Sequence, residues 1–68
     1  MRATKKYNIL IGDEIYTAEF FKNHFHYGRG WIIKLPGINW FESDPSVQYM
    51  KRSVRKEFPK AKFELVHN

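Results

Sequence analysis

Two histidines separated by a single residue have a spacing that allows two kinds of chemistry. On a β-strand, His24 and His26 project from the same face. One neutral and one protonated imidazole can act as acid and base in RNA cleavage, as in a small toxin-type ribonuclease. The same pair can supply two metal ligands, completed by Glu19 or His67. Because no cysteine, HExxH spacing or nearby carboxylate accompanies the rings, we predict no metal site and keep the ribonuclease as a third hypothesis.

The carboxylates lack the pairing expected of an enzyme. The chain has seven of them, at Asp13, Glu14, Glu19, Glu42, Asp44, Glu57 and Glu64. No two show the pattern of a two-metal nuclease, and neither a nucleophile elbow nor a dinucleotide-binding fingerprint is present. We therefore predict a non-enzymatic protein with no catalytic residue and no cofactor.

Cations on one predicted helix are the strongest functional signal. At about 100° per residue, four Lys and Arg side chains fall on one flank of the helix, beside its apolar stripe. Such a flank is suited to phosphates, because binding relieves the repulsion between its charges and releases counterions. We extend the surface with two lysines after the helix, a Gly-Arg-Gly loop and two lysines near the start of the chain. The predicted nucleic-acid contacts are Lys51, Arg52, Arg55, Lys56, Lys60, Lys62, Arg29, Lys5 and Lys6.

These cations are also compatible with an ordinary solvated surface and with a protein partner. A solvated helix face carries similar charges, and basic residues late in a helix also favour its macrodipole. A larger acidic protein is a second class of partner. In that alternative the chain is a protein-interaction module, such as a small phage-type or mobile-element regulator or inhibitor of a host protein.

Twelve aromatic residues are a high number for a chain of this length. Some must fill the core, but one helix on one sheet leaves the other sheet face uncovered. Exposed aromatic rings among Lys and Arg bind single-stranded nucleic acid, and they also form energetic hot spots in protein interfaces. The candidates for a protein interface are Trp31, Trp40, Phe41 and Tyr49.

Alternating apolar residues and turn signals define the elements that must position these side chains. We expect strands over residues 7–11, 15–21, 31–35, 39–42 and 63–65. Residues 17–25 are compatible with a strand or with a short helix capped by Thr17, and their aromatic content favours the strand. Residues 27–30 are expected to form a loop, and residues 35–38 a turn with Pro and Gly at its centre.

A helix is expected from Asp44, as its N-cap, to Phe58, with Pro45 in its first position and Pro59 ending it. Its apolar stripe consists of Val47, Met50, Val54 and Phe58. The fold class is therefore α+β. We expect a small, mostly antiparallel sheet of three or four strands, covered on one face by one amphipathic helix, in the order β-β-β-(β)-α-β.

The length of 68 residues allows one domain, which we place at residues 7–68 after a basic flexible arm at residues 1–6. No apolar run approaches the roughly 20 residues of a membrane helix, so no membrane partner is expected. The absence of cysteine fits a reducing cytoplasm. The formal net charge of +5, from 12 basic and 7 acidic residues, favours an anionic partner. Small sheets pair at their edges, so a homodimer is compatible with the sequence.

Short segments resemble parts of known families. Three strands followed by a helix resemble the three-stranded DNA-binding domains of integrase arm-binding type and of plant transcription factors, and Trp40-Phe41-Glu42-Ser43 is similar to the aromatic residues and cap before their helix. The turn Leu35-Pro36-Gly37 resembles an element of HicB-type antitoxins. Each resemblance covers few residues, so no functional residue is transferred from these families.

Overall fold

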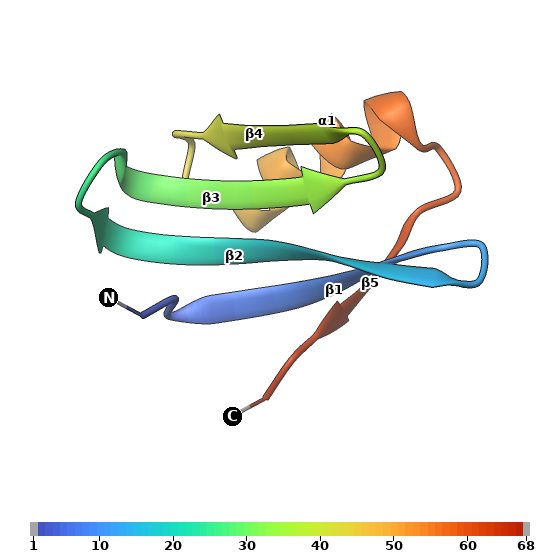
Figure 1. Ribbon diagram of the computed structural model, residues 1–68, viewed down its shortest axis with the longest axis horizontal. Coiled ribbons are helices and arrows are strands. Elements are labelled where there is room, and N and C mark those ends of the chain that lie inside the picture. Colours follow the sequence, from blue (N-terminus) through green and yellow to red (C-terminus); the bar gives the residue numbers. More distant parts are fainter. Residues whose placement is uncertain (1, 68) are drawn as a thin grey trace.

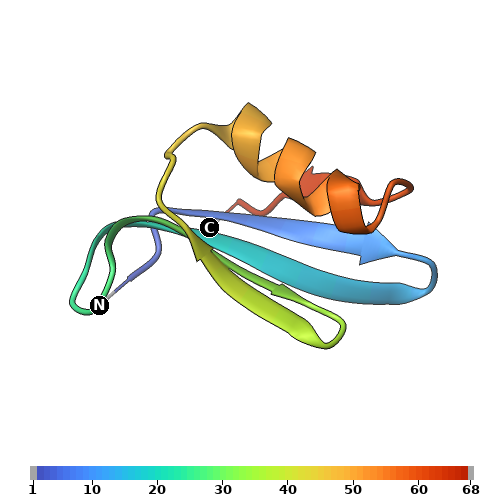
Figure 2. The same cartoon turned by 90° about the horizontal axis from the view of Figure 1, so that it is seen from above.

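Five strands form an antiparallel sheet, and one helix covers one of its faces (Figures 1 and 2). This computed structural model describes residues 2–67. The elements are β1 (Lys5–Ile11), β2 (Glu14–His24), β3 (Gly28–Leu35), β4 (Ile38–Glu42), α1 (Val47–Glu57) and β5 (Lys62–Leu65). Their order in the sheet is β4-β3-β2-β1-β5. The α+β class and the order β-β-β-β-α-β are confirmed, and the sheet has five strands because β5 returns to pair with β1.

Residues 17–25, for which the sequence allows a strand or a short helix, are strand as far as His24. β2 continues to His24 and pairs with β3 along most of its length. Ala18 and Phe20 are buried while the residues between and after them are less so, which is the two-residue period of a sheet with one covered face. A register shift between Phe21 and His24 marks a bulge at the end of the hairpin.

The helix begins two residues later than predicted. Its N-cap is Ser46, whose hydroxyl accepts a hydrogen bond from the Tyr49 N–H over 3.2 Å. Asp44 instead accepts a hydrogen bond from the Ser46 N–H over 2.9 Å, so it holds the turn that precedes the helix. Pro45 consequently lies outside the helix. The end is as expected, because Phe58 is the C-cap immediately before Pro59.

Two expected loop segments are partly strand. β3 begins at Gly28, so Arg29 and Gly30 belong to the sheet rather than to a loop. β1 begins at Lys5 because the Thr4 N–H donates to the Phe20 carbonyl over 2.8 Å and aligns the chain with β2. The basic arm expected over residues 1–6 is correspondingly shorter. Residues 1 and 68, which belong to the expected arm and domain, lie outside the described residues.

The core lies between the helix and the sheet. It consists of Ile9, Ala18, Phe20, Trp31, Ile33, Leu35, Met50, Val54 and Ala61. The helix contributes its apolar stripe, and each long strand contributes every second residue. The alternate residues form the uncovered side of the sheet, which we call the open face. It carries Lys6, Asn8, Leu10, Ile15, Thr17, Glu19, Phe21, Ile32, Lys34, Asn39, Phe41, Lys62 and Glu64.

Candidate nucleic-acid interface

Two cations of the helix rest on aromatic rings of the sheet. The Lys51 Nζ lies 5.3 Å from the centre of the Tyr7 ring and 5.7 Å from that of Phe63. The Arg55 guanidinium carbon lies 5.0 Å from the centre of the Phe63 ring. Lys51 and Arg55 are four residues apart and hence neighbours on the helix surface. Cations within about 6 Å of a ring centre are attracted to its face, so these two side chains are held in place.

A third cation continues this arrangement at the start of β1. The Lys5 Nζ lies 5.7 Å from the centre of the Phe20 ring. Lys5 and Tyr7 project from the same face of β1, so Lys5 lies on the helix side of the sheet. The Trp31 ring contacts the rings beneath both lysines. Its centre lies 5.2 Å from that of Phe20 and 5.8 Å from that of Tyr7. The Phe20 ring beneath Lys5 and the Tyr7 ring beneath Lys51 are therefore connected through Trp31.

We call Lys5, Lys51, Arg52 and Arg55 the basic ridge. Arg52 is exposed and lies three residues before Arg55, on the solvent side of the same helical flank. Figure 2 shows the helix above the sheet. Lys51 and Arg55 lie on the β5 side of the helix, because both contact the ring of Phe63 in β5. Three of the four predicted phosphate contacts of the helix are thus grouped with one lysine of β1.

The remaining predicted cations point elsewhere. Lys56 lies on the β4 side of α1, where it borders a hollow with Ile38 and Trp40. Lys60 borders a different hollow after the helix. The other three are dispersed: Lys6 and Lys62 lie on the open face, and Arg29 is an exposed residue of β3. A single surface that includes all nine predicted contacts is therefore not formed.

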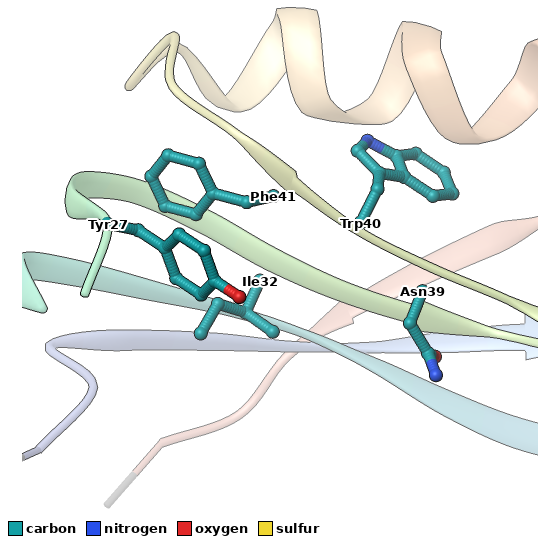
Figure 3. Close-up of a pocket in the computed structure, with 5 residues that line it drawn as sticks. All are labelled: Tyr27, Ile32, Asn39, Trp40 and Phe41. Carbon is teal, nitrogen blue, oxygen red and sulfur yellow. The ribbon is translucent and has the colours of Figure 1, made fainter.

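The four aromatic residues proposed for a protein interface differ in burial and in the face on which they lie. Trp31 is fully buried and its indole N–H donates to the Pro45 carbonyl over 3.2 Å, so its prediction as an interface contact is wrong. The cause is its central position in β3, directly beneath the helix. Trp40 is half-buried and turns toward the helix side (Figure 3). Tyr49 is exposed on the outer side of α1, and Phe41 lies on the open face.

Four rings at the end of the β2–β3 hairpin form a column that the sequence pattern did not reveal. We call Phe41, Tyr27, His24 and Phe25 the hairpin stack. Successive ring centres lie 4.9 Å, 5.0 Å and 5.2 Å apart, with interplanar angles of 20°, 30° and 11°. Phe25 is 75% exposed and Tyr27 is 56% exposed. The signal in the sequence is the run His-Phe-His-Tyr before a glycine, which we interpreted through its histidines alone.

A glycine provides the space that Phe41 occupies. A Cβ atom on Gly30 would overlap the end of the Phe41 ring and the Glu42 carbonyl oxygen. Gly30 also has a positive φ of 155°, which side-chain-bearing residues rarely adopt. The ring can therefore lie flat over the backbone of β3 and reach Tyr27.

A shallow hollow of about 120 Å³ opens beside the Phe41 and Tyr27 rings on the open face (Figure 3). Ile32 lies beneath the two rings, and the side-chain amide of Asn39 stands at the other end of the hollow. The hollow thus combines aromatic and aliphatic walls with one group that can both donate and accept hydrogen bonds.

The two histidines lie within the aromatic cluster at the end of the β2–β3 hairpin. The His26 backbone N–H donates to the His24 Nδ1 over 3.1 Å, so this nitrogen is already an acceptor within the turn. The ring centres are 6.0 Å apart, and the His24 ring is part of the hairpin stack. Within residues 2–67 no group of three or more potential ligands is placed to hold a metal ion. The geometry assigns His24 to the aromatic surface.

The helix of the described region is too short and too polar to cross a membrane. No protein-family model, no curated protein and no solved structure matches this chain. Functional inference therefore depends on the basic ridge and the hairpin stack themselves.

Proposed function

We propose that the protein is a small non-enzymatic nucleic-acid-binding protein that holds phosphate groups along the basic ridge. The observation that supports this most strongly is the position of Lys51 and Arg55 over the rings of Tyr7 and Phe63. These contacts hold the cations beside one another, with the exposed Arg52 next to them.

Pre-positioning favours binding because long basic side chains otherwise lose rotamer entropy when they are fixed, up to about 2 kcal/mol each. The rings restrict Lys51 and Arg55 before any partner arrives. Two like charges four residues apart on a helix also repel each other by a few tenths of a kcal/mol. A phosphate between them removes this repulsion and releases the counterions that had screened it.

The chemistry of the ridge predicts binding with little dependence on base sequence. Lysine and arginine that contact phosphates position a nucleic acid without reading its bases. The net charge of +5 adds long-range attraction for any polyanion. We therefore expect affinity that falls steeply as salt concentration rises.

A salt titration of the double variant Lys51→Gln and Arg55→Gln tests the proposal. Binding of a labelled DNA duplex is measured by fluorescence anisotropy over a series of salt concentrations. The slope of log K against log salt concentration should become shallower by about 2, because two phosphate contacts are lost.

The matched control is Lys34→Gln with Lys62→Gln, which removes the same charge from the open face. This variant should lower affinity only slightly and leave the slope within about 0.5 of its original value. Affinity that does not respond to salt, or equal changes of slope in the two double variants, would show that the ridge does not bind phosphates.

A further inference from the structure

We infer that the hairpin stack is a binding surface for the unpaired bases of a single-stranded nucleic acid. This inference rests on the proposed function, which it makes more specific by naming the class of nucleic acid. Proteins bind single strands by stacking bases on aromatic side chains next to a positively charged track. The hairpin stack supplies the first of these and the basic ridge supplies the second.

The rings of the stack are available to a ligand. Phe25 has most of its surface in solvent, although the His26 ring also packs against it with ring centres 4.0 Å apart, and Tyr27 is more than half exposed. Their orientation is fixed by mutual stacking, since His24 lies between them with ring centres 5.2 Å and 5.0 Å away. A base that packs against such rings meets a surface that needs little reorganisation.

The hollow at the other end of the column suits the edge of a base. Its walls are the rings of Phe41 and Tyr27, with Ile32 beneath them (Figure 3). Asn39 and Phe41 project from the same side of β4, so the amide stands beside the ring. A side-chain amide both donates and accepts, and can therefore contact the polar edge of any of the bases.

The charge around the stack favours a polyanion over a second copy of this chain. Residues 20–41 contain Lys22, Arg29 and Lys34, and the nearest carboxylates are Glu19, which pairs with Ile32 on the open face, and Glu42, so the cations outnumber the acids around the patch. Two such surfaces facing each other would bring like charges together. A single-stranded nucleic acid supplies the opposite charge together with flat apolar rings, and so matches both properties of the patch.

The stack and the ridge can be reached by one strand. Lys5 pairs with Phe20, close to the bulge of the β2–β3 hairpin, so the ridge begins at the end of the sheet that carries the stack. Figure 1 shows the start of β1 and the β2–β3 turn at the same end of the molecule. Because the hollow opens on the open face and Lys5 lies on the helix side, a strand that contacts both surfaces passes around this end of the sheet.

The experiment compares three labelled probes: a deoxythymidine oligomer, an abasic deoxyribose-phosphate chain of the same length, and a duplex. Phe25→Ala and Tyr27→Ala should each weaken binding of the deoxythymidine oligomer by about 5- to 150-fold, the range expected for one lost base–aromatic contact. Affinity for the abasic chain and for the duplex should stay within about 2-fold. The conservative variant Phe25→Trp should retain binding of the oligomer.

Tyr49→Ala is the matched control, because it removes an exposed ring from the outer side of α1. It should change none of the three affinities. Circular dichroism and urea unfolding check that each variant is folded. If Tyr27→Ala unfolds, the pair Phe25→Ala and Phe25→Trp still decides the question, since Phe25 lies outside the core.

Two results would overturn the inference. One is an equal loss of affinity for the oligomer and the abasic chain in Phe25→Ala, or no loss for either probe. The other is a dimer, detected by light scattering, that dissociates in Phe25→Ala, because the stack would then be a self-interface. If either result is found while the salt dependence of binding still requires Lys51 and Arg55, the hairpin stack is rejected and the basic ridge is retained. If binding requires the bases but its salt dependence does not change in the Lys51→Gln and Arg55→Gln variant, the basic ridge is rejected and the hairpin stack is retained.

Discussion

The contact between Gly30 and Phe41 links the backbone of β3 to the aromatic surface of the hairpin. Any side chain at Gly30 would collide with the Phe41 ring and the Glu42 carbonyl oxygen. We expect Gly30→Ala to lower the free energy of unfolding by about 2–4 kcal/mol, from overpacking and an unfavourable φ together. Urea denaturation measures the loss.

The control for this prediction is Gly12→Asn. Gly12 also has a positive φ, of 60°, but a Cβ there has open space around it, and Asn tolerates this conformation. The control should cost less than about 1 kcal/mol. If the two substitutions lowered the free energy of unfolding by similar amounts, the close packing of the Phe41 ring on Gly30 would be contradicted.

Tyr16 has a pH dependence that follows from one hydrogen bond. The phenol donates to the Glu14 carboxylate over 2.7 Å, and this bond, followed by slight desolvation and the charge of Glu14, raises the pKa of Tyr16 above its ordinary value. The neutral phenol is therefore favoured in the folded protein. Its stabilising effect is fully present below about pH 10 and is lost as the pH rises through the folded pKa.

Ultraviolet titration of tyrosinate tests this expectation. The difference between the titration curves of the parent protein and Tyr16→Phe isolates Tyr16, and its midpoint should lie above pH 10 by an amount that Glu14→Ala removes. A midpoint that does not respond to Glu14→Ala would show that the hydrogen bond is absent in solution.

The sequence shows which residue types could form a site, but it does not show which residues of each type are buried. Trp31 and Trp40 both occupy predicted strands, and only the pairing of β3 with β2 and β4 places Trp31 under the helix. The hairpin stack was missed for a related reason. Its four rings come from the end of β2, from the β2–β3 turn and from β4, and no local pattern relates Phe41 to Tyr27.

At the scale of elements, the N-terminus of α1 depends on one hydroxyl. Ser46 caps the helix through its bond to the Tyr49 N–H. We expect Ser46→Ala to lower the free energy of unfolding by about 1 kcal/mol, the usual cost of a lost cap. Chemical denaturation checks the value.

Ser43→Ala is the matched control for the cap, since Ser43 is exposed in the segment before the helix. It should change stability by less than about 0.5 kcal/mol. If Asp44 were the true cap, Asp44→Ala would cost as much as Ser46→Ala was expected to, and Ser46→Ala would be neutral.

The cap was predicted two residues too early because two signals coincide. Asp before Pro is a strong helix start, and Pro suits the first helical position. The apolar stripe of α1, by contrast, could be predicted correctly, because Met50 and Val54 follow the helical period and are buried. The helical period is read from many residues together, whereas the position of the helix N-terminus depends on a single hydrogen bond.

At the scale of the whole molecule, stability depends on a core of few residues. Met50 is fully buried between the helix and the sheet. We expect Met50→Ala to cost about 2–5 kcal/mol, which is a large part of the roughly 3–10 kcal/mol available to a chain of this length. The urea midpoint should fall while the dependence of the free energy on urea stays constant.

Leu65→Ala provides the comparison, because Leu65 is 47% exposed at the end of β5. Its cost should stay below about 1 kcal/mol. Equal destabilisation by the two substitutions would indicate that the helix does not pack on the sheet as described.

The fold class could be predicted because strand and helix periods differ and because one amphipathic helix needs a sheet to cover. The sequence could not show that β5 joins the sheet beside β1, since that pairing connects Ile9 with Phe63 across most of the chain. It also could not show that the helix divides its cations, with Lys51 and Arg55 on the β5 side and Lys56 on the β4 side.

The position of β5 has a consequence for protein synthesis. β1 lies inside the sheet, between β2 and β5, although β1 is translated early and β5 late. Pairings this distant in the chain form slowly, because a long loop must close first. Phe63, on which Lys51 and Arg55 rest, leaves the ribosome after both of them. The β1–β4 meander can therefore form first from neighbouring pairings, but Lys51 and Arg55 gain their contacts with Phe63 only when β5 has paired with β1.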